Sequence, residues 1–214
     1  MRIKIIANPK KQWAIALASE LEAFLAQNSQ HRAVKRKADA TICIGGDGTI
    51  LYAHHKGRIE GTVLGIGSGK SYVCQLRNTD WKERLFPLIE GGKTVMIMTL
   101  RCKLGNRPVT ALNDFLIHAT NYRVAELEVA YDEGQGKQAA AFEGDGIIIS
   151  SALGSAAYAF SAGGEKLAPT ERKLSLVPIC PYKRAFSPKM IAEGGKVAVK
   201  AGSDCAFIVD GIYV

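Results

Sequence analysis

A single aspartate among three glycines is the part of this sequence that most directly suggests chemistry. The run "GGDGT" (45–49) follows the apolar run "TICI" (41–44), and apolar residues resume directly after it. A glycine-rich turn between a strand and a helix binds anions well, because backbone N–H groups and the helix N-terminus face the ligand. A carboxylate in that place repels phosphate, so we expect Asp47 to accept a proton or to handle a metal ion. The structural alternative is a tight turn in which Asp47 caps the following helix.

A second glycine-containing stretch, "GDGIIISSALGSAAYAFSAGG" (144–164), combines an apolar strand with a loop of small residues. Small side chains in such a loop let a ribose or an aromatic ring approach the backbone closely. The stretch alone is equally consistent with a sheet corner that is lined with small residues for packing.

The elements that must position these turns differ between the two parts of the chain. Trp13, Leu17, Leu21 and Leu25 recur every fourth residue, which is the spacing of one buried helix face. Strands are predicted at 2–7, 41–44 and 61–67, with further helices from residue 50 and at 81–92. This alternation predicts a parallel sheet covered by helices, so we expect an α/β domain over residues 1–93.

After residue 93 the pattern changes to strand-like runs that are broken by Gly, Asn or Pro. Helical spacing is scarce there, apart from a possible short helix within 154–164. We therefore expect a second, mostly β domain over residues 94–214.

Composition narrows the class of protein and its partners. The 214 residues are 47% hydrophobic and 22% charged, as in an ordinary globular protein, and neither a membrane span nor a secretory leader is apparent. We expect a cytoplasmic location, no membrane partner, and reduced thiols at the five scattered cysteines. The net charge of +8 suits an anionic partner. The basic run "HRAVKRK" (31–37) lacks interleaved aromatic residues, so nucleic acid is only a minor alternative.

Taken together, the motifs of this chain resemble those of the NAD kinase family. The long stretch 144–164 is the most specific match, whereas "GGDGT" also occurs in lipid kinases and in part in phosphofructokinases. Four shorter matches follow the family's order, namely "IIANPKK" (5–11), "LND" (112–114), "LVPICP" (176–181) and "VDG" (209–211).

The resemblance implies a fold, an activity and a set of ligands. The fold is a Rossmann-like α/β N-terminal domain followed by a β-rich, β-sandwich-like C-terminal domain. The activity is phosphorylation of the adenosine-side ribose 2′-hydroxyl of NAD to give NADP, with ATP or polyphosphate as donor. A divalent metal ion, Mg²⁺ in the first instance, is implied as the cofactor. NAD and ATP are the implied ligands, and a homodimer or homotetramer the implied assembly.

The resemblance also assigns roles to particular residues. Asp47 takes the place of the presumed base on the 2′-hydroxyl. The implied donor-phosphate loop consists of Gly45, Gly46, Gly48 and Thr49. On the acceptor side the resemblance places Asn113 and Asp114 at the adenosine portion, Asp145 at the nicotinamide portion, and Ala157, Tyr158 and Ser161 along the adenine and ribose wall. No metal-ligating side chain is assigned.

Several positions depart from the family's pattern, and they fall on the acceptor side. The family has Thr-Pro-Thr, Thr and His where this chain has Ser151 to Leu153, Ala156 and Tyr182, and its Glu is shortened to Asp114. Each lost hydrogen bond to a ligand costs on the order of 1 kcal/mol. Two alternatives therefore stay open: a non-catalytic NAD(P)-binding sensor or degenerate paralogue, and a kinase of the lipid-kinase-like superfamily with another acceptor.

Overall fold

The computed structural model describes residues 1–27, 30–132, 136–202 and 204–213, with the side chain of residue 213 left out. The chain divides into two compact units, Met1–Val95 and Met96–Val214. All five cysteines are free thiols. None of the helices in the described part of the chain is long and apolar enough to cross a membrane.

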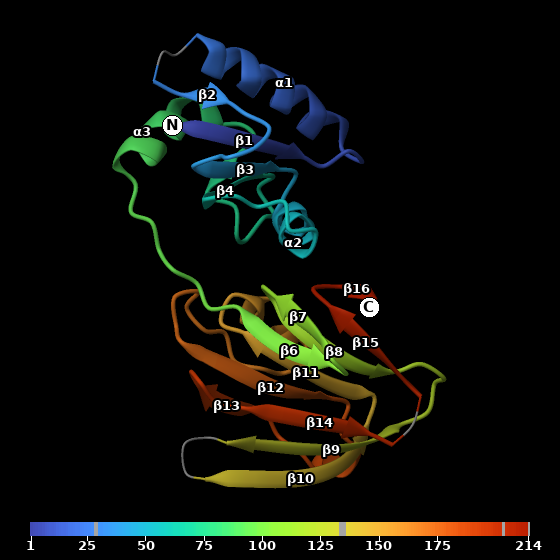
Figure 1. Ribbon diagram of the computed structural model, residues 1–214. Helices are drawn as coiled ribbons and strands as arrows, with labels where there is room; N and C mark the ends of the chain where they lie inside the picture. The colour runs from blue at the N-terminus through green and yellow to red at the C-terminus, as the bar shows by residue number, and fades with distance from the viewer. Residues whose placement is uncertain (28–29, 133–135, 203, 214) are drawn as a thin grey trace. The chain divides into compact units, whose positions relative to one another are not determined.

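Unit 1 is built on a five-stranded parallel sheet with the strand order β2-β1-β3-β4-β5 (Figure 1). Apolar residues fill the central strands, and β3 is buried along its whole length. The strands are β1 (Arg2–Ala7), β2 (Arg32–Ala33), β3 (Ala40–Ile44), β4 (Thr62–Gly67) and β5 (Leu76–Arg77). The short edge strand β2 lies within the basic run 31–37, outside the strands that the sequence predicts.

Helices cover both faces of this sheet, as buried parallel strands require. The helices α1 (Gln12–Ala26) and α3 (Trp81–Gly91) share one core with the sheet, where Phe24 packs against Trp81 with ring centroids 5.4 Å apart. The helix α2 (Asp47–His55) lies on the opposite side of the sheet (Figure 1). It begins at Asp47, three residues earlier than the apolar pattern predicts.

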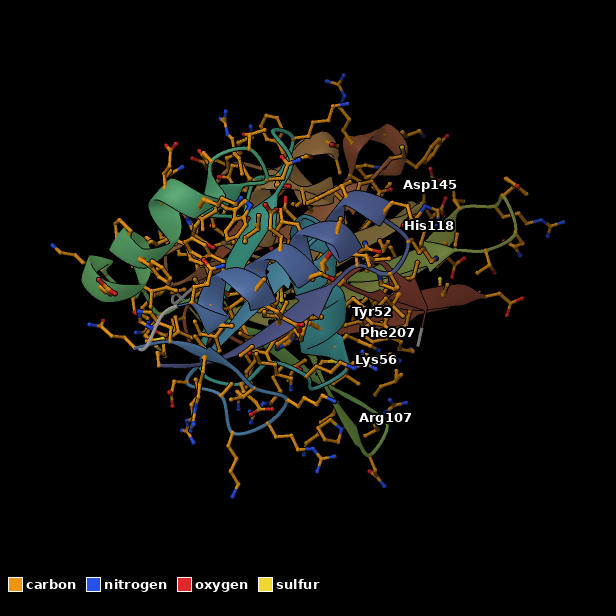
Figure 2. All side chains as sticks on the ribbon, turned by 90° about the horizontal axis from the view of Figure 1, so that it is seen from above. Tyr52, Lys56, Arg107, His118, Asp145 and Phe207 are labelled. Atoms are coloured by element: carbon orange, nitrogen blue, oxygen red, sulfur yellow. The ribbon has the colours of Figure 1, made fainter. Side chains whose placement is uncertain are left out.

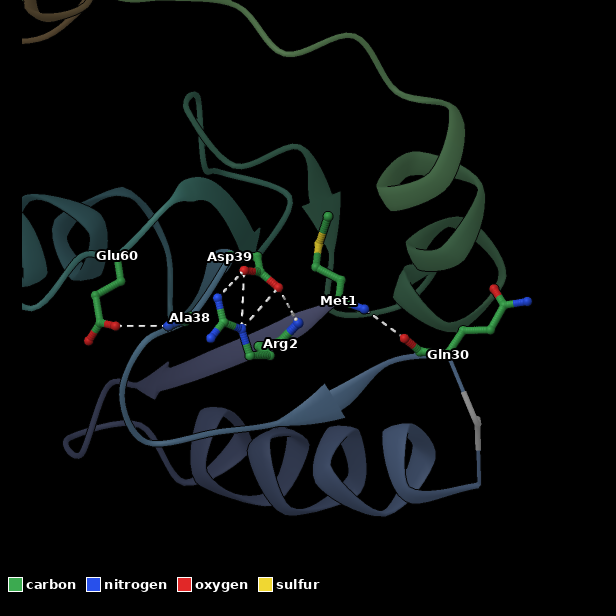
Figure 3. A network of polar contacts seen from close by, with 6 residues as sticks. All are labelled: Met1, Arg2, Gln30, Ala38, Asp39 and Glu60. Atoms are coloured by element: carbon green, nitrogen blue, oxygen red, sulfur yellow. Dashed lines mark hydrogen bonds and ion pairs between the residues drawn. The ribbon is translucent and has the colours of Figure 1, made fainter.

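The amino-terminal edge of this sheet is tied by polar contacts (Figure 3). Arg2 pairs with Asp39 through Nη2 and Oδ1 at 2.6 Å, and its backbone N–H donates to Oδ2 of the same carboxylate at 2.7 Å. The Arg2 guanidinium holds the pKa of Asp39 down at about 2. Glu60 accepts the backbone N–H of Ala38 at 2.9 Å. These contacts fix the connections that enter β3 and β4, at the edge remote from the glycine turn.

Unit 2 consists of antiparallel sheets. Its six-stranded sheet has the order β13-β12-β11-β8-β15-β16, its three-stranded sheet the order β10-β9-β14, and β6 and β7 form a hairpin. The strands are β6 (Leu100–Leu104), β7 (Arg107–Ala111), β8 (Asp114–Ala119), β9 (Ala125–Asp132), β10 (Lys137–Gly144), β11 (Gly146–Ser151), β12 (Lys173–Ile179), β13 (Lys189–Ala192), β14 (Val197–Ala201), β15 (Cys205–Val209) and β16 (Ile212–Tyr213).

The two larger sheets of unit 2 pack face to face. Leu127 and Val129 of β9 and Phe142 of β10 share one buried cluster with Ile147 of β11 and Leu176 of β12. The opposite face of the six-stranded sheet is covered by the short helix α4 (Tyr158–Ser161), which follows the 3₁₀ turn η1 (Gly154–Ala156). The expected fold class, an α/β part followed by a β-rich sandwich, is confirmed.

Candidate active site

One group of candidate site residues lies at the carboxyl edge of the parallel sheet in unit 1. In open parallel sheets, ligands bind outside the carboxyl ends of the strands. Three loops leave this edge: Asn8 follows β1, Gly45 follows β3, and residues 68–75 follow β4. The backbone N–H of Asn8 donates to the Ile44 carbonyl at 2.8 Å, and that of Gly45 donates to the Ile66 carbonyl at 3.0 Å. The three loops are thus held in register with one another.

The glycine turn has a backbone that other residues adopt only under strain. Gly45 has φ 141° and Gly46 has φ 105°. A Cβ at Gly45 would lie 2.5 Å from the Cβ of Asn8. At Gly48, by contrast, a Cβ would meet nothing within 4 Å, so the first turn of α2 is open at that point. The turn therefore combines a tight passage from β3 with an accessible helix N-terminus.

Asp47 does not cap α2, because the N-cap is Gly46 and no side chain caps the helix. Its carboxylate instead accepts three backbone N–H groups from the loop after β4. The Tyr72 N–H donates to Oδ2 at 2.7 Å, and the N–H groups of Val73 and Cys74 donate to Oδ1 at 2.9 and 3.3 Å. A carboxylate has about four lone-pair positions, so roughly one remains for an incoming hydroxyl or for the neighbouring Cys74 thiol.

The loop 68–75 is packed closely enough to hold Asp47 in place. The side chain of Ser71 occupies the space where a Cβ on Gly67 would lie, and Cys74 does the same at Gly65. Burial, followed by the Asp47 carboxylate, raises the pKa of the Cys74 thiol to about 12. The sequence did not predict that this loop contacts Asp47, although the glycines at 65 and 67 mark the close approach.

The remaining predicted residues of the donor loop differ in accessibility. Thr49 is 4% exposed, and its Oγ1 is buried with no hydrogen-bond partner among the described residues. Its hydroxyl packs against Gly45 rather than facing solvent. The sequence offered no signal for Lys11, whose Nζ donates to the Gly45 carbonyl at 2.5 Å.

A separate group of candidate site residues lies in unit 2, where "LND" (112–114) contacts two distant segments. The Asp210 carboxylate accepts the backbone N–H groups of Leu112, Asn113 and Asp114 at 2.9, 2.7 and 3.2 Å. The Ser151 hydroxyl donates to the Leu112 carbonyl at 2.5 Å and accepts the Gly154 N–H at 3.1 Å. The backbone of Asn113 and Asp114 is thus fixed from both sides, while Asn113 Oδ1 is buried without a partner among the described residues.

A row of buried polar side chains crosses the six-stranded sheet beside this segment. Asp114, Ser150 and Ser175 lie directly opposite one another on neighbouring strands, on the face that α4 covers. They are 8%, 0% and 0% exposed. Burial, reinforced by the Asp210 carboxylate, raises the pKa of Asp114 to about 6. Sequence reasoning missed both serines and Asp210 as site residues; for Asp210 the "VDG" motif was the available signal.

Asp145 lies at the other end of β11. It precedes Gly146, whereas Ser150, opposite Asp114, is near the strand's carboxyl end. At about 3.4 Å per residue the two acids are roughly 17 Å apart along the strand. Asp145 is beside His118 (Figure 2), and its carbonyl accepts the Ala119 N–H at 2.9 Å. The two predicted acids of unit 2 therefore lie near opposite ends of β11.

The other predicted acceptor-side residues are exposed. Ala157 is the N-cap of α4, and Tyr158 and Ser161 begin and end that helix. Among the divergent positions, Ala152 and Leu153 are buried, at 1% and 6% exposure. Leu153 therefore packs inside the unit and does not replace a ligand-facing hydroxyl with an exposed apolar group.

Two further divergent positions remain accessible. Ala156 is partly exposed and Tyr182 is 56% exposed. Tyr182 begins the 3₁₀ turn η2 (Tyr182–Arg184), where Lys183 and Arg184 both have positive φ, 52° and 56°. Residues other than glycine rarely adopt a positive φ, and strained backbone of this kind clusters at ligand sites.

Among the residues that the structure describes, a divalent metal ion has no ready-made set of ligands. In the described part of the chain, no three His, Cys, Asp or Glu side chains come together. Asp47 already accepts three backbone donors. The residues therefore do not fit a resident metal, and an Mg²⁺ ion would have to arrive mainly on the donor phosphates.

Comparison with known proteins decides the family. Residues 112–214 match the model of the ATP-NAD kinase C-terminal domain. The NAD kinase of Thermoplasma acidophilum is 31% identical over 209 residues, which cover 94% of this chain and 74% of that protein. The chain belongs to the NAD kinase family.

Other members agree with this family and with the fold. The NAD kinase of Clostridium perfringens is 35% identical over 184 residues; the alignment covers 81% of this chain and 66%, just under two thirds, of that protein. The fold matches an NAD kinase from Archaeoglobus fulgidus in complex with ATP (TM-score 0.83, 21% identity, covering 100% and 86% of the two chains). It also matches yeast NADH kinase complexed with NADH (TM-score 0.84, 19% identity, covering 100% and 74%).

Proposed function

We propose that this chain is an NAD kinase, which transfers the γ-phosphoryl group of ATP to the adenosine-side ribose 2′-hydroxyl of NAD. The observation that carries the proposal is the position of Asp47. It lies in a glycine turn at the carboxyl edge of a parallel sheet, and its carboxylate is fixed by three backbone donors. Membership of the NAD kinase family supports the choice of substrates.

In the proposed reaction, a lone pair of the 2′-oxygen forms a bond to the γ-phosphorus while the bond from that phosphorus to the β,γ-bridging oxygen breaks. ADP leaves with the electron pair of that bond, and the hydroxyl proton passes to Asp47. The loop donors point Oδ2 of Asp47 in a fixed direction, so little reorganisation is needed when the hydroxyl arrives. Since phosphoryl transfer depends mainly on positioning and charge neutralisation, a rigid base suits it.

The donor phosphates are assigned to the glycine turn. Gly48 is exposed in the first turn of α2, so the N-terminus of this helix can accept an anion. Gly45, whose N–H is bonded to the Ile66 carbonyl, and Gly46 are buried and shape the turn. Thr49 contributes by packing beneath the turn, because its hydroxyl is buried. When Mg²⁺ is bound to the phosphates it neutralises part of their charge; no step is assigned to protein ligands of the ion.

The acceptor is assigned to unit 2. The partly buried Asn113 and the buried Asp114 form the adenosine end, and Asp145 forms the nicotinamide end. Their separation along β11 supports an extended ligand with polar groups at both ends. Ala157, Tyr158 and Ser161, on and beside α4, supply the exposed wall for the adenine and its ribose.

The test is NADP formation from NAD by the purified protein, with ATP and Mg²⁺, and with polyphosphate and NADH in parallel wells. Asp47→Asn should lower the rate by about 10²- to 10⁴-fold, the usual worth of a positioned base. Glu22→Gln changes an exposed carboxylate on α1 in the same unit and is the matched control. Absence of NADP and NADPH under all conditions in the wild type would overturn the proposal, and an active Asp47→Asn variant would overturn the role of Asp47.

The homodimer or homotetramer is a proposal that rests on the resemblance alone. Light scattering coupled to size-exclusion chromatography would measure the mass directly. A monomer at assay concentration would contradict it.

A further inference from the structure

Lys11 lies over the glycine turn although it is distant in sequence. Its Nζ donates to the Gly45 carbonyl at 2.5 Å, and it would be 3.8 Å from a Cβ on Gly46. Lys11 therefore places a positive charge beside Gly45 and Gly46, the two residues that precede Asp47.

The local sequence accounts for this placement. Asn8 ends β1 with a tight turn in which its side chain accepts the Lys10 N–H at 2.9 Å and its carbonyl accepts the Lys11 N–H at 3.2 Å. Lys11 is then the N-cap of α1. The Trp13 ring, whose centroid is 5.9 Å from the Lys11 ammonium, flanks the side chain. The turn thus fixes the backbone from which Lys11 reaches Gly45.

The charge of Lys11 has no anionic partner within the part of the chain that the structure describes. Its ammonium contacts a neutral carbonyl, and no described carboxylate is within ion-pair distance. Lys11 is also exposed, so a ligand can reach it. A carbonyl satisfies one of the three ammonium donors, which leaves two for an anion.

A glycine turn that binds phosphate beside a carboxylate needs a cationic side chain. The sequence lacks the Walker A pattern, whose lysine contacts the terminal phosphates of a nucleotide. The glycine turn supplies N–H dipoles but carries a negative charge at Asp47. A cation at the same turn offsets that charge where phosphate must bind.

We infer that Lys11 binds the terminal phosphates of the donor and neutralises charge on the transferred group, in the role that the lysine of a Walker A loop has. The contact is with the γ-phosphate or its neighbour, because the reacting phosphorus must lie close to Asp47. This inference rests on the proposed function, in which the glycine turn receives the donor.

The experiment compares Lys11→Met, which keeps the length of the side chain but removes the charge, with Lys11→Arg and the control Lys10→Met. Lys10 is the adjacent exposed lysine, and its ammonium makes no hydrogen bond or ion pair with the described residues. Affinities for ATP, ADP and adenosine are measured by calorimetry, and the rate of NADP formation is measured in the same preparations.

Lys11→Met should weaken ATP binding about 10- to 100-fold, as expected for loss of a charged hydrogen bond, and should leave adenosine binding unchanged. Lys11→Arg should restore part of the loss, and Lys10→Met should behave as the wild type. A structural role would instead change ATP and adenosine alike, and that result, or unchanged ATP binding, would overturn the inference. If the wild type forms no NADP, the proposed function fails, and the calorimetry still decides whether Lys11 binds phosphate.

Discussion

Replacing Asp114 with asparagine should make unit 2 more stable at neutral pH and have little pH-dependent effect in acid. Asp114 is buried, faces the row of serines across the six-stranded sheet, and shares its surroundings with the Asp210 carboxylate. Asp210 is fixed by three backbone donors, so Asp114 is the member of the pair that must give up its charge.

The size of the effect follows from the pKa of Asp114, which rises from 3.8 to about 6 in the folded protein. A group whose pKa is raised by folding stabilises the folded state fully below its unfolded pKa, and this contribution is lost as the pH rises through the folded pKa. The difference between the two pKa values corresponds to about 3 kcal/mol. Between about pH 4 and pH 6 the wild type should therefore lose about 3 kcal/mol that Asp114→Asn retains.

Urea unfolding at a series of pH values from acid to pH 8, followed by far-ultraviolet circular dichroism, measures this difference. Trp13 and Trp81 are the two tryptophans and both belong to unit 1, so their fluorescence serves as an internal reference that should not change. Asp204→Asn, at an exposed aspartate of unit 2, is the matched control. A stability difference that is the same at pH 4 and pH 8 would refute the reasoning, as would an equal effect of Asp204→Asn.

Three further substitutions test how the acceptor-side residues of unit 2 are held in place. Ser151→Ala removes a hydroxyl that bridges two backbone groups and should lower the free energy of unfolding in urea by about 1–3 kcal/mol. Ser175→Ala removes a buried hydroxyl without a partner among the described residues and should be close to neutral. Equal costs for the two variants would contradict this difference. Gly154→Ala forces a Cβ into the backbone of Asn113, so it should cost about 1–3 kcal/mol of stability in the same assay and weaken NAD binding. An unchanged dissociation constant for NAD would show that the position of the loop around Gly154 does not matter for binding.

Helix α1, the parallel sheet and the family can each be predicted from local sequence patterns. The spacing of Leu17, Leu21 and Leu25 predicts α1, and all three are buried against the sheet. Alternation of strands and helices predicts the parallel sheet, because crossovers between parallel strands need helices. The long motif 144–164 predicts the family, since its small residues and strand occur in a specific order. Such signals are local, and they depend on side-chain size and polarity along a few turns or strands.

The start of α2 shows where local signals end. The apolar pattern places the helix from residue 50, yet it begins at Asp47 because Gly46 can adopt the φ of 105° that enters it. The pattern also leaves open whether Asp47 caps the helix. In the structure its carboxylate instead accepts hydrogen bonds from backbone N–H groups of a loop 25 to 27 residues further along the chain. No periodicity near "GGDGT" contains that information.

The sequence by itself determined the main element types, the two-part fold class and the identity of the turn residues, because each depends on side chains that are neighbours in the sequence. Only the tertiary structure decided what those residues contact. Lys11 meets Gly45 across 34 positions, and Asp210 meets Asn113 across 97. These contacts depend on which strands pair and in what register, and hydrogen-bonded register joins residues that share no local pattern. The charges and donors that would act on a substrate therefore became visible only once the sheets were assembled.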